Sequence, residues 1–156
     1  MKILNRVYTG SYKNCKSGNL ISISGDRGRS VGFEGKAIRE LAPKKKFWQE
    51  WHDMLDKVTE EESMRFYIEN YYKEVLKKVD IEQLLKDEID PILLCFEESY
   101  EFCHRHIVAK YIEYMYGIEV EEIEIDEEGN IKVNDIMEEI KRILEEVIEN
   151  DELELE

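Results

Sequence analysis

The feature that most limits how this chain can fold is a buried-strand pattern followed closely by an amphipathic helix. The apolar run from Pro91 to Phe96 predicts a strand over 91–97, because a short apolar segment between turn-forming residues is typical of buried strands. After Cys103, apolar residues recur at helical spacing until Gly117, a residue type that commonly ends helices. A strand, a loop and a covering helix in this order are the repeating elements of parallel α/β proteins.

Other segments extend the same pattern. Residues 3–9 and 20–24 are rich in apolar and β-branched side chains and predict two earlier strands. Helical spacing recurs between 47 and 85, where Thr59 opens a capping-box signature. We therefore predict an α/β fold for residues 1–116, with a small, mostly parallel sheet flanked by helices.

Residues 117–156 have a different pattern. Apolar and acidic side chains alternate over 120–125, a Glu-Gly-Asn turn signal follows at 128–130, and 131–133 returns to a strand-like composition. Apolar residues then recur at helical spacing beyond Asn134. We predict a C-terminal β-hairpin plus helix extension that packs on the same domain.

Charge is distributed very unevenly along the chain. Residues 1–46 contain 11 Lys and Arg against 3 Asp and Glu, whereas residues 113–156 contain 3 against 18. The formal net charge of −15 disfavours non-specific binding of nucleic acid at long range. The basic segment can still hold a small anion, and the acidic segment can keep the protein soluble or occupy a basic surface.

Three cysteines and the short apolar runs bear on where the protein resides. The first residues lead directly into a strand-like run, so we expect no secretory leader and no membrane-spanning segment. An odd number of cysteines in such a chain favours a reduced, cytoplasmic protein with free thiols.

Reactive and anion-binding side chains gather where the predicted strands end. Parallel sheets bind ligands outside the carboxyl ends of their strands. This rule brings together the residues after the second strand, those after the 91–97 strand, and the start of the next helix. The expected ligand-binding residues are Ser24, Asp26, Arg27, Arg29, Cys95 and Arg105, and the candidates for catalysis are Cys103, His104 and Glu97.

The same residues carry a resemblance to a known family. The Leu-Cys-Phe-Glu sequence at 94–97, followed by Cys-His-Arg at 103–105, resembles the bacterial and archaeal family of domains of unknown function numbered 488. That family pairs a Leu-Cys-x-Glu strand end with a Cys-His-Arg helix start, and residues 24–30 are similar to its early Asp- and Arg-containing segment. The resemblance covers residues 1–116 and implies a small α/β fold with a site at these motifs, but no established reaction. The segment after Gly117 departs from the family pattern.

Each cysteine of the motif has more than one candidate role. At a helix start beside His104 and Arg105, Cys103 would have a lowered pKa, as in a nucleophile or redox thiol. It can equally pack under the loop or contact a substrate without reacting. Cys95 ends a buried strand, where a core role competes with a reactive one. A redox role for the pair requires the two thiols to approach within disulfide geometry.

The charged residues of the motif also allow alternatives. The helix dipole disfavours a cation in the first turn, so Arg105 indicates a negative partner, either a ligand anion or Glu97 or Asp26. His104 is a candidate general acid or base or a cap facing water, and His106 is expected on the surface. The helix start therefore contributes either to a ligand site or to an internal ion pair.

Residue spacing argues against several common ligand sites. The glycine-rich loop at 25–32 lacks the ending of a P-loop and the spacing of a dinucleotide fingerprint, and its alternatives are a phosphate-binding loop or a surface loop. Cys95, Cys103, His104 and His106 lack the two-residue spacing of a zinc knuckle. We expect no metal and no cofactor.

Aromatic residues lie at helical spacing in the middle of the chain, namely Trp48, Trp51, Tyr67, Tyr71 and Tyr72. We expect them in the core and at its rim. The alternative is a base-stacking platform near the three lysines at 44–46.

Three functions compete for the predicted site. The first is a ligand site for a small anion or nucleotide-like molecule. The second is a non-enzymatic interaction protein linked to nucleic acid or stress, and the third is a thiol redox sensor. The expected partners are a small anionic ligand and, through the amphipathic last helix, a second copy of the chain. The residues leave open whether the site is catalytic.

Overall fold

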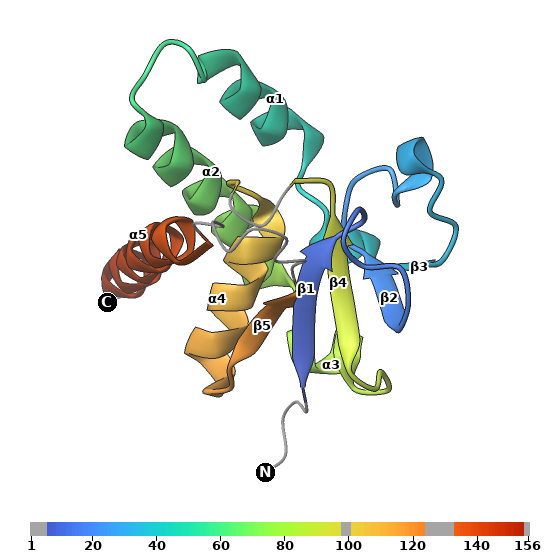
Figure 1. The fold of residues 1–156 in the computed structure, drawn as a ribbon. Coiled ribbons are helices and arrows are strands. Elements are labelled where there is room, and N and C mark those ends of the chain that lie inside the picture. Colours follow the sequence, from blue (N-terminus) through green and yellow to red (C-terminus); the bar gives the residue numbers. More distant parts are fainter. Residues whose placement is uncertain (1–5, 98–100, 124–132, 155–156) are drawn as a thin grey trace.

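Among the described residues, five parallel strands form one sheet, in the order β3-β2-β4-β1-β5. The computed structural model describes residues 6–97, 101–123 and 133–154, with the side chains of 133–135 left aside (Figure 1). The strands are β1 (Val7–Ser11), β2 (Asn19–Ser22), β3 (Lys36–Ala37), β4 (Pro91–Cys95) and β5 (Val120–Ile123). The predicted α/β fold with a parallel sheet is confirmed.

Strand β4 lies at the centre of the sheet, between β2 and β1. All five of its residues are buried, because both faces of the sheet are covered at this position. In β1, Thr9 is the register partner of both Leu93 in β4 and Glu122 in β5. The predicted buried strand over 91–97 corresponds to β4, and the structure places it at the middle of the sheet.

Three helix ends coincide with capping residues in the local sequence. The helices are α1 (Lys45–Met54), α2 (Glu60–Glu74), α3 (Ile81–Leu85), α4 (His104–Tyr116) and α5 (Val133–Glu154), with short 3-10 turns η1 (Arg29–Val31), η2 (Arg39–Leu41) and η3 (Leu76–Lys78). The Thr59–Glu62 capping box begins α2, and the Asp80 side chain accepts from Gln83 N at the start of α3. Gly117, with φ of 69°, ends α4 in the left-handed conformation that glycine adopts without strain.

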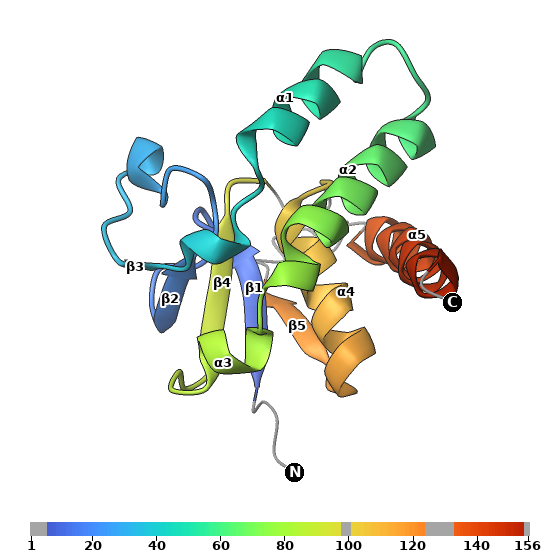
Figure 2. The same cartoon turned by 180° about the vertical axis from the view of Figure 1, so that it is seen from behind.

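The helices cover the sheet in layers. Helix α4 packs on β1, β4 and β5, and α5 packs in turn on α2 and α4. Figures 1 and 2 show α1 above the edge where the strands end, with α3 at the opposite end of the sheet. On the face of the sheet that is turned away from α4, Tyr12, Cys15, Ile92 and Leu94 form a smaller apolar cluster. This arrangement leaves the carboxyl edge of the sheet beneath α1.

The C-terminal segment joins the sheet differently from the prediction. The expected first hairpin strand is β5, and it pairs in parallel with β1. Residues 124–132, which contain the expected turn and most of the return strand, lie outside the described residues, and Val133 already belongs to α5. The alternating pattern at 120–125 predicted a strand but not its partner, because pairing is set by distant residues.

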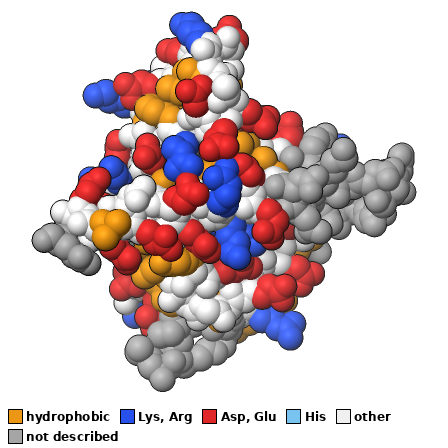
Figure 3. Space-filling model, turned by 90° about the vertical axis from the view of Figure 1, so that its left-hand side faces the viewer, with side chains coloured by type: hydrophobic (Ala, Val, Ile, Leu, Met, Phe, Trp, Pro, Cys, Tyr) orange, Lys and Arg blue, Asp and Glu red, His pale blue; other side chains and the backbone are white. Residues whose placement is uncertain are grey.

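Helix α5 presents a charged outer face. Figure 3 shows many acidic side chains with a few basic ones between them on the side of the molecule that carries α5. Arg65 of α2 pairs with Glu146 at 2.6 Å, and Lys77 of η3 pairs with Asp151 at 2.9 Å. These ion pairs tie α5 to its neighbours. Within the described residues, no helix is long and apolar enough to cross a membrane.

Candidate functional site

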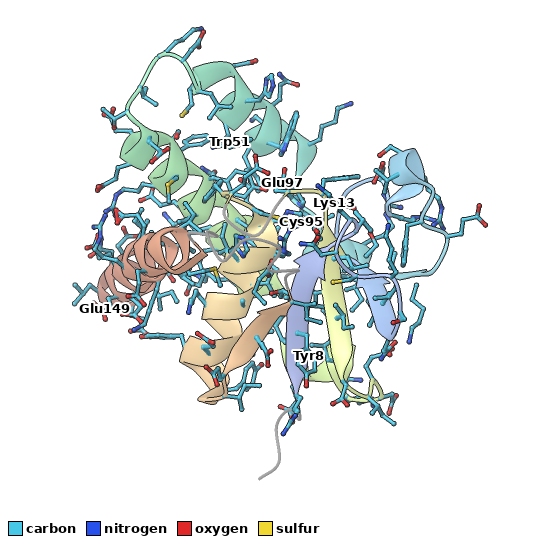
Figure 4. The ribbon with its side chains drawn as sticks, viewed as in Figure 1. Tyr8, Lys13, Trp51, Cys95, Glu97 and Glu149 are labelled. Atoms are coloured by element: carbon cyan, nitrogen blue, oxygen red, sulfur yellow. A yellow bond between two sulfur atoms is a disulfide. The ribbon has the colours of Figure 1, made fainter. Side chains whose placement is uncertain are left out.

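A cavity of about 620 Å³ lies at the carboxyl edge of the sheet. Its lining comes from the loop after β2, the segment before α1, helices α1 and α2, the loop after β4 and the start of α4. Figure 4 shows Trp51, Glu97 and Cys95 one below another between α1 and the end of β4. The cavity therefore lies where parallel sheets commonly bind their ligands.

The structure places five of the nine expected site residues on this cavity, namely Ser24, Asp26, Glu97, Cys103 and His104. All three candidates for catalysis are among them. Arg27, Arg29, Cys95 and Arg105 do not belong to the described lining. Of these four, Cys95 and Arg105 lie directly beneath it.

The loop after β2 is held by a compact set of hydrogen bonds. The Tyr12 hydroxyl lies 2.6 Å from Ser22 Oγ and 2.5 Å from Ser24 Oγ. Asp26 accepts from the backbone N–H groups of Gly28 and Ser30 at 2.7 and 3.0 Å. Burial raises the pKa of the Asp26 carboxyl, but the Ser30 side chain together with these backbone N–H groups outweighs burial and brings the pKa below its usual value. A charged, fixed carboxylate therefore stands at the cavity.

The two arginines of this loop lie away from the cavity. Arg27 and Arg29 are both exposed, and Arg29 Nη1 donates to Phe33 O at 2.6 Å. Gly28, with φ of 78°, packs against the Tyr12 ring so closely that a Cβ would lie 2.8 Å from it. Both arginine side chains are therefore outside the described lining of the cavity.

Cys95 and Cys103 form a disulfide, which overturns the expectation that all the thiols are free. Cys95 ends β4 and Cys103 is the N-cap of α4. The end of β4 and the start of α4 therefore lie side by side, where the two sulfurs meet. Among the described cysteines, Cys15 is the free one, and burial raises the pKa of its thiol.

Arg105 is fully buried and paired with a residue that the sequence did not identify. Its Nε and Nη2 donate to the Glu122 carboxylate, with Nη2 to Oε2 at 2.7 Å. Thr9 Oγ1 donates to the same carboxylate at 2.6 Å. Burial raises the pKa of Glu122, but the hydrogen bonds and charge of Arg105 more than offset this and lower it. Arg105 therefore forms its ion pair with Glu122 in β5, and not with the predicted carboxylates of Glu97 or Asp26.

The remaining guanidinium nitrogen of Arg105 faces the sulfurs. Nη1 lies 3.2 Å from Cys95 Sγ and 3.5 Å from Cys103 Sγ, and it donates to Glu97 O at 2.8 Å.

The sequence did contain an indication that Glu122 pairs with a cation, because Glu122 shares the strand face of buried Val120. An acidic residue on a buried face needs a cation.

His104 is a buried neutral histidine. Its Nε2 lies 2.7 Å from Ile23 O, and a carbonyl can only accept, so Nε2 carries the proton and Nδ1 is the acceptor. Burial lowers the pKa of His104 to about 4, and the charge of Arg105 adds to this effect. Any acid–base role at neutral pH therefore falls to Nδ1.

Glu97 provides a second carboxyl at the cavity. Burial raises its pKa above the usual value, although its own backbone and Arg105 oppose the shift. Its Oε1 lies 3.6 Å from Cys95 Sγ. A carboxyl with a raised pKa beside a sulfur can give or take a proton there.

His106 is buried, and the prediction of a surface position is wrong. Its Nδ1 lies 3.8 Å from Glu122 Oε1. Helix α4 runs between the sheet and α5, so every residue from 104 to 109 is buried. The consecutive apolar residues at 107–109 are the sequence sign of a helix covered on all sides.

A metal could be held by one group of side chains among the described residues. One ligand atom from each of Cys95, Cys103 and His104 lies within 4.8 Å of the others. However, both sulfurs are joined to each other, and the Arg105 guanidinium lies against them. A metal cation beside that guanidinium would be repelled, so the geometry favours sulfur chemistry.

Aromatic and basic residues complete the cavity. Trp48, Trp51, Tyr67 and Phe102 line it, with the Trp51 and Tyr67 rings 5.1 Å apart. Arg39, Lys44 and Lys45 also line it. From the sequence, the tryptophans and lysines were an alternative site only, and Arg39 and Phe102 were not among the expected site residues. Two sequence features indicated this part of the lining: the helical spacing of the aromatic residues and the run of lysines at 44–46.

The fold and the cavity define a small parallel α/β protein with a candidate ligand site at the carboxyl edge of its sheet. The family model DUF488-N3a, described as the active DUF488-N3 subclade, matches residues 8–116. The chain belongs to the DUF488 family. No curated protein and no solved structure matches it. Strand β5 and helix α5 follow the matched region.

Proposed function

We propose that the cavity binds a small phosphorylated ligand with an aromatic group, as in a mononucleotide. The observation that carries this proposal is that two helices begin at the cavity without the usual caps. Helices α1 and α4 have no side-chain cap and no acidic residue in the first turn. In contrast, α2 and α3 have both.

Free helix N-termini favour anions. Their backbone N–H groups lack partners within the helix, and the helix dipole adds partial positive charge. Lys44 and Lys45 stand at the start of α1, and Arg39 lies on the same cavity. A phosphate at this position would accept from backbone and side-chain donors together.

The aromatic wall supports the second half of the ligand. Stacking of a base on aromatic side chains tolerates any base, because each has a π face. The Nε1–H of Trp51 is buried, and no acceptor among the described residues reaches it. A ligand acceptor would satisfy this donor. The volume of about 620 Å³ is within the range of small-molecule sites.

Thermal unfolding in the presence of a ligand panel tests the proposal. AMP, ADP, adenosine and inorganic phosphate are added separately at millimolar concentration. A ligand at ten times its Kd stabilises a protein by about 1.4 kcal/mol, which raises Tm by a few degrees. We expect AMP or ADP to exceed both adenosine and phosphate. No shift with any phosphorylated compound would refute the proposal.

A charge reversal locates the phosphate. Lys45→Glu should weaken AMP binding by about tenfold, measured by calorimetry, because it replaces a cation beside the phosphate with an anion. Lys46→Glu is the matched control, since Lys46 is exposed in the same helical turn and is not part of the described lining. We expect the control to change Kd by less than about twofold. Equal weakening of AMP binding in the two variants would show that the phosphate does not bind at the start of α1.

A further inference from the structure

The two sulfurs of the Cys95–Cys103 disulfide differ in access. Both residues are buried, with Cys103 3% and Cys95 0% exposed, but Cys103 lines the cavity and Cys95 does not. A small reagent that enters the cavity therefore meets Cys103 first. Thiol chemistry is directional at such a pair, because the sulfur that is attacked and the sulfur that leaves are fixed by access.

The surroundings of the pair suit thiolates better than a disulfide. A disulfide carries no charge, yet Arg105 Nη1 lies within 3.5 Å of both sulfurs. The Glu122 carboxylate balances much of the charge of Arg105 and holds the guanidinium in place. What remains for the sulfurs is a directed N–H donor, and Cys103 also lies at a helix N-terminus.

We propose that Cys95 and Cys103 are a reversible dithiol–disulfide centre, which hydroperoxides oxidise and low-molecular-mass thiols reduce through the cavity. Cys103 is the reacting sulfur and Cys95 is the resolving sulfur. This activity uses the same cavity as the proposed ligand but does not require that ligand to bind.

Oxidation takes two steps. The Cys103 thiolate attacks one oxygen of a hydroperoxide ROOH, the O–O bond breaks, and RO⁻ leaves and is protonated to ROH. Cys103 is then a sulfenic acid. The Cys95 sulfur attacks it, the S–S bond forms, the S–O bond breaks, and hydroxide leaves as water with the Cys95 proton. Two thiols have given two electrons to one peroxide.

In reduction, Cys103 is again the sulfur that meets the external reagent, and Cys95 is the first to become a free thiolate. An external thiolate attacks Cys103 Sγ, the S–S bond breaks, and Cys95 leaves as a thiolate beside Arg105. Glu97, with Oε1 at 3.6 Å, is placed to protonate it. A second external thiol then attacks the mixed disulfide, which frees Cys103 and releases the oxidised external disulfide.

The test uses the full chain with Cys15→Ser, which removes the free thiol. Reduced protein is treated with about one equivalent of hydrogen peroxide and analysed by peptide mass spectrometry. We expect a 95–103 linked peptide that glutathione reduces again. In Cys15→Ser/Cys95→Ser, dimedone should label Cys103, at least about tenfold more than it labels Cys95 in Cys15→Ser/Cys103→Ser.

Three results would overturn the proposal. The first is that both thiols stay free after peroxide treatment in protein whose Tm shows it to be folded. The second is dimedone labelling that favours Cys95. The third is a zinc ion that purified protein releases only when its thiols are alkylated, because the pair would then be a metal site.

Discussion

Glu122→Gln is expected to lower the free energy of unfolding by about 3 kcal/mol. Arg105 is 0% exposed, and Nε and Nη2 both donate to the carboxylate that this change removes. Removing one partner of a buried ion pair leaves the other charge without compensation, which costs more than the pair contributes. Thr9 also loses its carboxylate acceptor. Urea unfolding followed by circular dichroism measures the difference.

The adjacent strand residue provides the matched control. Glu121 lies on the exposed face of β5, so Glu121→Gln removes the same charge without touching Arg105. We expect it to change stability by less than about 0.5 kcal/mol. Equal losses in the two variants would mean that the buried pair contributes nothing beyond general charge.

This ion pair joins the region that the family model matches to the segment that follows it. Arg105 belongs to the region that the family model matches, and Glu122 follows that region. The match ends at residue 116, just before the turn into β5. The Cys-His-Arg sequence at 103–105 thus obtains its counterion from the acidic segment, and the sulfur centre depends on β5 for the position of its guanidinium.

Local signals explain how much of the fold could be predicted. The capping box at Thr59, the cap at Asp80 and the terminating Gly117 are short-range patterns, and each begins or ends a helix as its chemistry requires. The apolar run ending at Cys95 is likewise local. In each case a few adjacent residues determine the backbone conformation.

Long-range packing explains what could not be predicted. The contact of Cys103 with Cys95 depends on α4 beginning beside the end of β4, and the pairing of Arg105 with Glu122 depends on β5 lying beside β1. Several acidic residues lie near Glu122 in sequence, so composition did not single it out. The cavity wall from α1 required the placement of a whole helix above the sheet edge.

His104 is expected to make the protein lose about 3 kcal/mol of stability as the pH falls from 7 to below 4. Burial lowers its pKa to about 4 in the folded protein, against about 6.5 in the unfolded chain. The unfolded state therefore takes up the proton first. Its contribution is fully present above pH 6.5 and is lost as the pH falls through 4. Urea unfolding at several pH values measures this slope.

Variants separate this histidine from the carboxyl groups that titrate nearby. His104→Asn keeps a donor for Ile23 O but cannot take up a proton, so its stability should fall less steeply between pH 6.5 and 4. His52→Asn is the control, because His52 is exposed on α1, and its profile should match the wild type. Parallel profiles for all three proteins would show that His104 is not buried as a neutral ring. A flatter profile for His104→Asn alone would establish that His104 is a neutral imidazole in the folded protein and takes up its proton more readily in the unfolded chain.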